Sequence, residues 1–260
     1  MVVVSVTLLA LSLAAAPFPG ARRPGSVDWE RGVVRCAGLG APRLAEEVES
    51  VAVTRAGTER AARRAARLAC LEVLRGISIT GSETVAARLE RYPAAARRVE
   101  DELRRSRPGV PRFFADGGAE VDLEVTLDGT LGDLLAGEAP VPDPVHREGV
   151  TDTGILVDAT GLRALPALAP RLLDEHGGEV YGLAVVRPAA RRRGLAVYED
   201  DPARAATAHL DRLGPSPRLV RAIRAEGVDL VISDDDAAAV RGQPCLAEGR
   251  VVILRSREVR

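Results

Sequence analysis

The first hydrophobic stretch of the chain spans residues 1–21, contains no charged side chain and is followed by Arg22 and Arg23. Its apolar part is short and ends in small residues, a pattern typical of a secretory signal peptide rather than of a transmembrane helix. No Lys or Arg precedes the apolar part, and cleavage after Ala16 or after Ala21 would place a proline close to the cut. The alternative is a buried N-terminal strand or helix. We expect residues 1–21 to be a signal peptide.

Small and apolar residues recur with helical spacing after a first short strand. Residues 32–38 form an apolar run bounded by glycine, which predicts a buried strand. Residues 58–76 then place alanines at helical intervals on one side and arginines on the other, with Thr58 as the expected N-cap and Gly76 as the stop. So many alanines predict a helix that approaches a sheet closely.

Strands and charged helices alternate in the remainder of the first half. Residues 77–80 alternate as a strand does, and residues 82–107 form a charged helical stretch in which Pro93 is expected to begin a second helix. Residues 121–127 alternate Val and Leu with Asp, Glu and Thr, the clearest half-buried strand in the chain. Together these elements predict an α+β domain over residues 28–136.

A linker and a β-rich α+β domain are expected in the second half. Residues 137–153 contain three prolines among acidic residues, which indicates a linker. Residues 154–257 contain apolar runs bounded by turn-forming residues. The expected strands are 154–159, 171–174, 179–186, 229–233 and 251–254, and the expected helices are 202–213 and 234–241. The fold class expected for the chain is α+β, with helices packed on one face of small mixed or antiparallel sheets in two small domains.

The composition argues against several classes of partner. The 260 residues are 46% hydrophobic and 28% charged, and the 3% aromatic content makes the expected core aliphatic. The formal net charge is −1, and the 36 basic residues, all arginine, are interspersed with 37 acidic residues. This balance gives no electrostatic footprint for nucleic acid or for an acidic membrane surface. We interpret the lack of lysine and asparagine as codon bias rather than as phosphate recognition.

The three cysteines, Cys36, Cys70 and Cys245, have neither zinc-site spacing nor the even number of a disulfide framework. Each lies among apolar neighbours, where cysteine usually acts as a small hydrophobic residue. An exported protein could instead pair two of them, because disulfides persist outside the cytosol. A bond between Cys36 and Cys70 would join the first strand to the first helix. Both interpretations are open at the level of the sequence.

Two glycines after the first strand resemble the beginning of a dinucleotide-binding loop. The third glycine of that fingerprint is missing because Arg43 occupies its position, and no helical pattern begins directly after Gly38-Leu39-Gly40. The chain also has no lysine for a phosphate-binding loop. Nucleotide binding therefore has little support, and no cofactor is expected.

Aspartates and histidines that could perform chemistry have simpler structural interpretations. Residues Asp234, Asp235 and Asp236 follow Ser233. This run fits a helix N-terminus, where acids stabilise the helix dipole, better than a metal site, which needs ligands from several segments. The three histidines are His146, His176 and His209. Because they are scattered along the chain, they are expected to form neither a metal cluster nor a base beside a nucleophile.

The remaining candidate for a binding site is an arginine run. Arg191, Arg192 and Arg193 are expected in an exposed loop, which could contact an anionic surface polymer. No Gly-x-Ser-x-Gly motif occurs. We therefore expect no enzymatic activity and assign no catalytic, cofactor-binding or metal-binding residue.

The first half resembles the LPP-twenty type of bacterial envelope lipoprotein. The resemblance rests on the strand and glycine turn of residues 33–40, on the alanine-rich helix of residues 59–74 with its repeated Arg-Ala-Ala, and on Gly-Ile-Ser-Ile at residues 76–79. That family includes proteins associated with the outer rings of flagella. The resemblance implies an envelope-located, non-enzymatic protein built from small α+β domains.

The second half is similar to a C-terminal block of related exported proteins. The similar segments are residues 154–162, 166–170, 179–182, 229–237 and 245–253. Lipoproteins of this kind carry a cysteine at the end of the signal for lipid attachment, but the first cysteine here is Cys36, beyond the leader. A soluble periplasmic or secreted form is therefore favoured over a lipid-anchored one.

These observations predict an exported structural or assembly protein of the cell envelope, linked to an outer-membrane or flagellar complex. We expect it to act with envelope proteins or with itself, with no nucleic acid and with no transmembrane segment after signal removal. The alternative function is a periplasmic binding module for a cell-wall polymer or small ligand, using the turn at residues 176–178 and the arginines of residues 191–193. An exported hydrolase is the least supported class, since it needs a constellation that only the fold could assemble.

Overall fold

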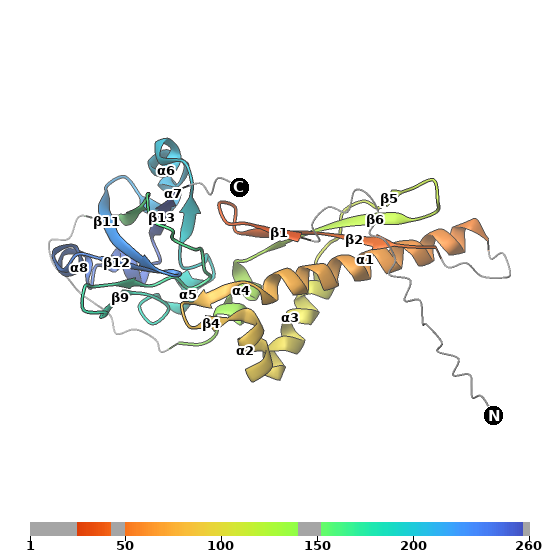
Figure 1. The fold of residues 1–260 in the computed structure, drawn as a ribbon, viewed down its shortest axis with the longest axis horizontal. Coiled ribbons are helices and arrows are strands. Elements are labelled where there is room, and N and C mark those ends of the chain that lie inside the picture. Colours follow the sequence, from red (N-terminus) through yellow and green to blue (C-terminus); the bar gives the residue numbers. More distant parts are fainter. Residues whose placement is uncertain (1–24, 43–49, 140–151, 257–260) are drawn as a thin grey trace, which may run out of the picture.

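The computed structural model describes residues 25–42, 50–139 and 152–256. Within them we distinguish an N-terminal region (residues 25–139) and a C-terminal region (residues 152–256), each built around its own sheet. Figure 1 shows the N-terminal region as an elongated arm beside the rounder C-terminal region. The expected signal peptide lies outside the described residues. No helix within the described ranges is long and apolar enough to cross a membrane.

The N-terminal sheet is antiparallel and has the strand order β1-β2-β6-β5. Its strands are β1 (Gly25–Asp28), β2 (Val33–Gly40), β5 (Arg112–Phe113) and β6 (Ala119–Thr126). Strands β2 and β6 pair over their whole length, from Val33 opposite Thr126 to Gly40 opposite Ala119. The alternation expected in β6 is confirmed, because Val121, Leu123 and Val125 are buried and the residues between them are exposed.

Helix α1 (Val51–Arg75) covers one face of this sheet (Figure 1). Its small apolar stripe is buried, as the spacing predicts. The helix begins earlier than expected, because Ser50 caps it by accepting the N–H of Val53 at 3.4 Å. Thr58 lies inside the helix and donates its hydroxyl to the carbonyl of Thr54 at 3.0 Å. The expected cap at Thr58 is therefore wrong, since a threonine hydroxyl can bond to the preceding helical turn.

A small hairpin and further helices complete the N-terminal region. They are β3 (Ser78–Thr80), β4 (Glu83–Thr84), α2 (Val85–Arg91), α3 (Pro93–Arg105) and α4 (Gly129–Ala136). Pro93 begins α3, as expected, because the first helical residue needs no N–H donor. The sequence pattern does not predict α4, since Asp128-Gly129 has the composition of a turn and lies at the start of this helix.

The C-terminal sheet is mixed and has the strand order β10-β13-β7-β11-β12-β8-β9. Its strands are β7 (Gly154–Ala159), β8 (Leu172–Leu173), β9 (Glu179–Tyr181), β10 (Val197–Glu199), β11 (Pro217–Glu226), β12 (Asp229–Ile232) and β13 (Val251–Arg255). Strands β10, β13, β7 and β11 run parallel to one another. Because a parallel sheet is covered on both faces, β7 and β13 have continuous apolar runs.

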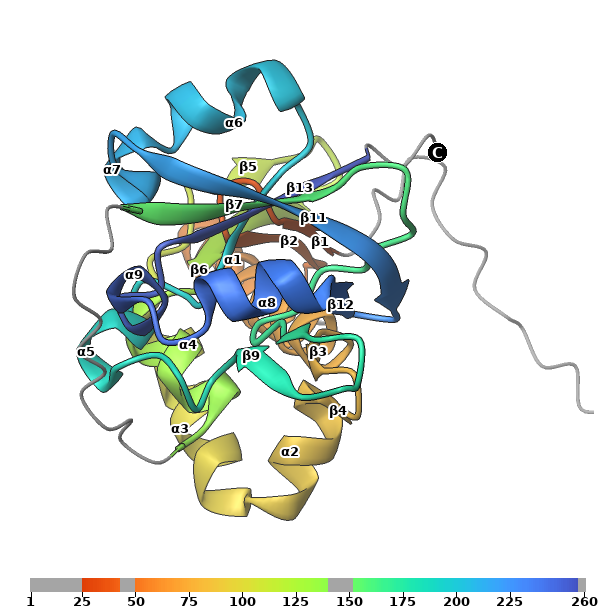
Figure 2. The same ribbon diagram turned by 90° about the vertical axis from the view of Figure 1, so that its left-hand side faces the viewer.

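Short helices cover the two sides of this sheet. They are α5 (Pro188–Arg191), α6 (Pro202–Ala208), α7 (Leu210–Leu213), α8 (Asp234–Val240) and α9 (Pro244–Ala247). Figure 2 shows α6 and α7 above strands β7, β11 and β13, with α8 and α9 below them. The single helix expected over residues 202–213 divides at His209 into α6 and α7.

The strands of this sheet differ in part from those expected. Strands β8 and β9 are shorter than expected, and residues 183–186 do not continue β9 because the chain turns there, with the N–H of Val185 donating to Gly182 at 3.1 Å. The pattern does not predict β11. Its outward-facing Leu219 and Ile223 are exposed, whereas Val220 and Ala222 are buried, so apolar residues lie on both faces.

The two regions share one hydrophobic core. The same cluster of buried side chains contains Ile79 from the N-terminal region and Ile155 from the C-terminal region. The N–H groups of Leu168 and Ala169 donate to the carbonyls of Ser78 and Ile79, at 3.0 and 2.8 Å. The β3–β4 hairpin therefore lies directly against the C-terminal region.

A partly buried ion pair lies beside this hairpin. Asp229, at the start of β12, pairs with Arg171 at 2.5 Å, and their side chains are 4% and 35% exposed, respectively. A Cβ atom at Gly81 would lie 2.6 Å from Oδ2 of Asp229. The turn between β3 and β4 thus closely approaches the carboxylate, which places the ion pair where the two regions meet.

Candidate functional site

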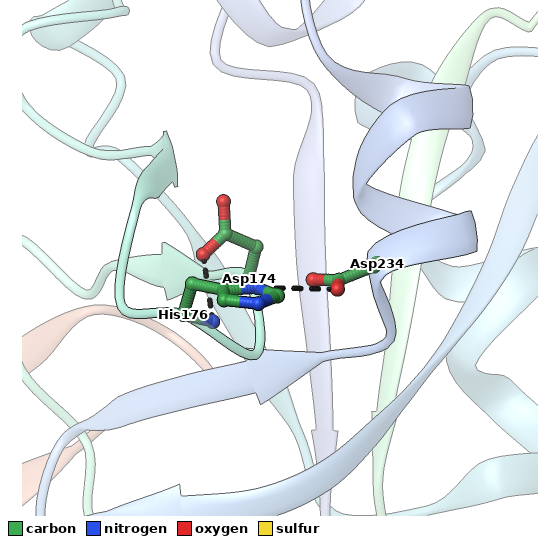
Figure 3. Close-up of side chains that lie close together, drawn as sticks. All are labelled: Asp174, His176 and Asp234. Atoms are coloured by element: carbon green, nitrogen blue, oxygen red, sulfur yellow. Dashed lines mark hydrogen bonds and ion pairs between the residues drawn. The ribbon is translucent and has the colours of Figure 1, made fainter.

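A histidine and two aspartates from separate segments lie together at the surface of the C-terminal region (Figure 3). Asp174 and His176 belong to the turn between β8 and β9, and Asp234 begins α8. Their ligand-type atoms all lie within 4.8 Å of one another, and Nδ1 of His176 is 3.2 Å from a carboxylate oxygen of Asp234. Imidazole and carboxylate groups are ligands that zinc accepts. Sequence analysis missed this cluster because no spacing shows that the turn meets α8.

Asp174 already has a structural role in the same cluster. Its Oδ1 accepts the N–H groups of Gly178 at 2.6 Å and His176 at 3.1 Å, and its Oδ2 binds Arg241 at 2.7 Å. The backbone hydrogen bond from Gly178, followed by that from His176 and the charge of Arg241, lowers the pKa of Asp174. A metal ion would have to compete with these donors. The contacts of this cluster therefore have a structural role first, because they connect the β8–β9 turn to α8.

The run of three aspartates has the capping role that the sequence predicts. Ser233 is the N-cap of α8, and its hydroxyl oxygen accepts the N–H of Asp236 at 3.1 Å. Asp234 also meets the turn, since its Oδ1 accepts the N–H of Glu175 at 3.1 Å. Asp235 and Asp236 do not belong to the cluster with His176.

The structure describes one of the other two histidines, His209. His146 lies outside the described residues. His209, between α6 and α7, lies with its Nε2 atom 3.1 Å from Oε2 of Glu199, whose side chain is only 1% exposed. The other carboxylate oxygen of Glu199 accepts the N–H groups of Asp200 and Asp201. This buried pair, which sequence spacing does not show, joins the α6–α7 boundary to β10.

The glycines of the Gly38-Leu39-Gly40 segment serve helix packing. The segment lies within β2, so the first strand is longer than the expected residues 32–38. A Cβ atom at Gly38 would lie 2.0 Å from the backbone nitrogen of Ala66, and one at Gly40 would lie 2.2 Å from the carbonyl oxygen of Thr58. Both glycines therefore let α1 lie close against the strand. Arg43, which takes the place of the third glycine of the fingerprint, lies outside the described residues.

A pocket lies between the two regions, lined by residues of both. This pocket of about 810 Å³ is bordered by α2, α3 and α4 on one side and by α5 on the other. Figure 2 shows these helices gathered in the lower part of the molecule. Arginines from both regions line the pocket, namely Arg88, Arg98, Arg191 and Arg192. Such a concave site with converging polar groups is where a small ligand usually binds.

The exposed loop that the sequence predicts at residues 191–193 is confirmed for the last two arginines and wrong for the first. Arg191 ends α5 and is buried, with Nε donating to the carbonyl of Val186 at 2.8 Å and Nη1 to that of Ala139 at 3.2 Å. Burial lowers the pKa of Arg191. Arg192 and Arg193 are exposed, as expected. The correction has a packing cause, because α5 turns the first arginine inward against the N-terminal region.

A disulfide joins β2 to α1. Cys36 and Cys70 are bonded across a sequence separation of 34 residues, with their Cα atoms 5.4 Å apart. This is the pairing that the sequence left as one of two interpretations. Cys245 is free and buried, and burial raises the pKa of its thiol to about 11.

Comparison with known proteins bears on the C-terminal region. The described part of the chain is an α+β protein with a four-stranded sheet, a seven-stranded sheet, the two-stranded β3–β4 hairpin and a disulfide in its N-terminal region. Residues 154–257 match the family model for the second domain of Tp0624 of Treponema pallidum. No curated protein matches the chain. The resemblance of the first half to LPP-twenty lipoproteins stays a prediction.

Proposed function

We propose that this protein is an exported, non-enzymatic structural or assembly component of the bacterial cell envelope. The observation that carries the proposal is the disulfide between Cys36 and Cys70. Disulfides form and persist in oxidising compartments and are rare in the reducing cytosol. The expected signal peptide supports the same location, and a periplasmic or secreted form of the protein follows from both.

The architecture of the described residues fits a scaffold role. The disulfide fastens α1 to β2 within the elongated arm in Figure 1. The shared core and the hydrogen bonds from Leu168 and Ala169 connect that arm to the C-terminal region. A rigid arm of this kind suits assembly into a larger envelope complex. The LPP-twenty resemblance implies flagellar structures as one such complex.

Cell fractionation followed by cross-linking tests this proposal. A bacterial host produces the chain with its own leader and a C-terminal tag, and cross-linking precedes extraction of the envelope fraction. We expect recovery outside the cytoplasm, together with cross-linked products that contain envelope proteins or a second copy of the chain. Recovery only from the cytosol, as a monomer without cross-linked partners, would overturn the proposal.

A second candidate function is a periplasmic binding module for a cell-wall polymer or a small ligand. The arginine-lined pocket between the two regions favours it, since such a pocket is suited to binding rather than to scaffolding alone. Co-sedimentation with isolated peptidoglycan tests the polymer form of this candidate. Enrichment in the pellet over a control protein is the expected result, and equal recovery of both proteins would contradict it.

A further inference from the structure

Guanidinium groups from three elements converge on the pocket between the two regions. Arg88 comes from α2, Arg98 from α3 and Arg192 lies directly after α5. The lining contains four arginines and two acidic residues, Asp133 and Glu138, so it carries an excess of positive charge. An arginine fork matches the geometry of carboxylate and phosphate groups. The pocket therefore has the chemistry of an anion site.

Arg88 is held in a fixed position at the pocket. One of its Nη atoms binds Glu83 at 2.5 Å, and both side chains are largely buried. A Cβ atom at Gly137 would lie 1.5 Å from the other terminal nitrogen, Nη1, so the glycine leaves the space that the guanidinium occupies. The Nε atom of Arg88 is shielded from solvent and has no acceptor among the described residues. Arg88 is thus held as a preorganised positive charge at the wall of the pocket.

Arg98 and Arg192 have the greatest freedom to bind a ligand. Arg98 is exposed, and no ion pair or hydrogen bond joins its side chain to any residue of the described ranges. Arg192 lies 3.4 Å from Asp133, and its side chain is 69% exposed, so this pair is weak. Tyr92 and Thr130 add a ring and a hydroxyl group to the same lining. These groups surround a volume within the range of small-molecule sites, roughly 300 to 1,000 Å³.

We propose that this pocket binds a small organic anion through its carboxylate or phosphate group, with Arg98 and Arg192 as the main donors and Arg88 as a fixed positive charge. Because the lining comes from both regions, the bound anion contacts α3 and the residue directly after α5 at once. The proposal deepens the second candidate function by naming its ligand class. It does not depend on export or on assembly, so the experiments on cell location leave it unaffected.

Calorimetric titration of the oxidised protein tests the site. Inorganic phosphate and citrate are the probes, glycerol is the neutral control, and the buffer has low ionic strength. We expect heat of binding with at least one anion and none with glycerol. Phosphate binding alone assigns the site to phosphorylated ligands, and citrate binding alone assigns it to carboxylates.

Two neighbouring arginines of α3 provide matched variants. Arg98→Gln removes a donor that lines the pocket, whereas Arg97→Gln removes an exposed arginine outside the lining. We expect Arg98→Gln to weaken anion binding by about tenfold, equivalent to about 1.4 kcal/mol, and Arg97→Gln to leave it unchanged. Amide NMR shifts should change at Thr130 and Gly137 during the titration. Absence of binding at millimolar anion, or an equal loss in both variants, would overturn the proposal.

Discussion

Gly38 of β2 lies so close to Ala66 of α1 that a Cβ atom at Gly38 would stand 2.0 Å from the backbone nitrogen of Ala66. The carbonyl oxygen of Ala62 would be almost as near, at 2.3 Å. These are main-chain atoms of a helix, so they cannot rotate away as a flexible side chain can. The close approach of α1 to the sheet therefore depends on this glycine.

Gly38→Ala should destabilise the protein by about 1 to 3 kcal/mol or more, because α1 must move away from β2. Gly57→Ala, within α1, is the matched control. A Cβ atom at Gly57 would meet no atom nearer than 4.0 Å, and alanine favours a helix by roughly 0.5 to 1 kcal/mol. Urea unfolding should give effects of opposite sign. Equal stabilities for Gly38→Ala and the native protein would refute the close packing.

Loss of the disulfide should lower the free energy of unfolding by about 3 to 4 kcal/mol. The bridge joins cysteines 34 residues apart in the sequence. Breaking it gives the unfolded chain more conformational entropy, which for a loop of this size lowers the stability by about that amount. Thermal unfolding with and without reductant measures the effect. The double variant Cys36→Ala/Cys70→Ala should resemble the reduced native protein and should not respond to reductant. A native protein equally stable in both conditions would contradict the structure.

Asp229→Ala should cost about 2 kcal/mol or more, because it leaves the half-buried Arg171 without its carboxylate where the two regions meet. Glu226→Ala is the control, since the Arg224–Glu226 pair is about half exposed on both sides. An exposed pair of this kind contributes about 0.5 kcal/mol at most. Chemical denaturation compares the two variants. Similar small losses of stability in both variants would show that the contact between the two regions does not depend on the Arg171–Asp229 pair.

Protonation of Asp158 at acidic pH should lower the stability of the native protein. Its Oδ1 accepts the hydroxyl of Thr160 at 2.5 Å and the N–H of Thr160 at 2.9 Å, and the hydroxyl hydrogen bond is the main cause that lowers the pKa of Asp158 below its ordinary 3.8. A carboxylate with a lowered folded-state pKa stabilises the fold above pH 3.8. That stabilisation is lost as the pH falls through the lowered value.

Thr160→Val removes the hydroxyl and should flatten the fall in stability as the pH drops below the ordinary pKa of Asp158, 3.8. At neutral pH the variant should be less stable by about 1 kcal/mol, the typical contribution of one hydrogen bond. Asp235→Asn serves as the control, because Asp235 is exposed and has no such partner among the described residues. Unfolding midpoints measured across this pH range give the comparison. Parallel curves for native protein and Thr160→Val would rule out the assigned role.

Local patterns predicted the elements that local physics determines. The alternation in β6 gave its buried face correctly, because side chains of a strand point alternately to its two faces. The alanine stripe of α1 likewise predicted close packing on a sheet. Ser233 and the following aspartates identified the start of α8, since a cap needs only neighbouring residues.

Tertiary contacts account for what the sequence pattern did not show. Strand β11 pairs with β7 along its first half and with β12 along its second half, so pairing rather than alternation makes it a strand. The inward position of Arg191 depends on the nearby carbonyl of Val186 and on the carbonyl of Ala139, 52 residues earlier in the chain. The meeting of His176 with Asp234 and the arginine-lined pocket arise in the same way, from elements far apart in the chain.

The oxidation state of the cysteines in cells tests the proposed extracytoplasmic role most directly. Differential alkylation and mass spectrometry of the chain, produced with its own leader, identify which thiols are free. We expect a linked pair of peptides that contain Cys36 and Cys70, a free Cys245 that is labelled only after unfolding, and a chain that has lost residues 1–21 or part of them. Free thiols at both Cys36 and Cys70, in a chain that keeps its leader, would contradict the proposal.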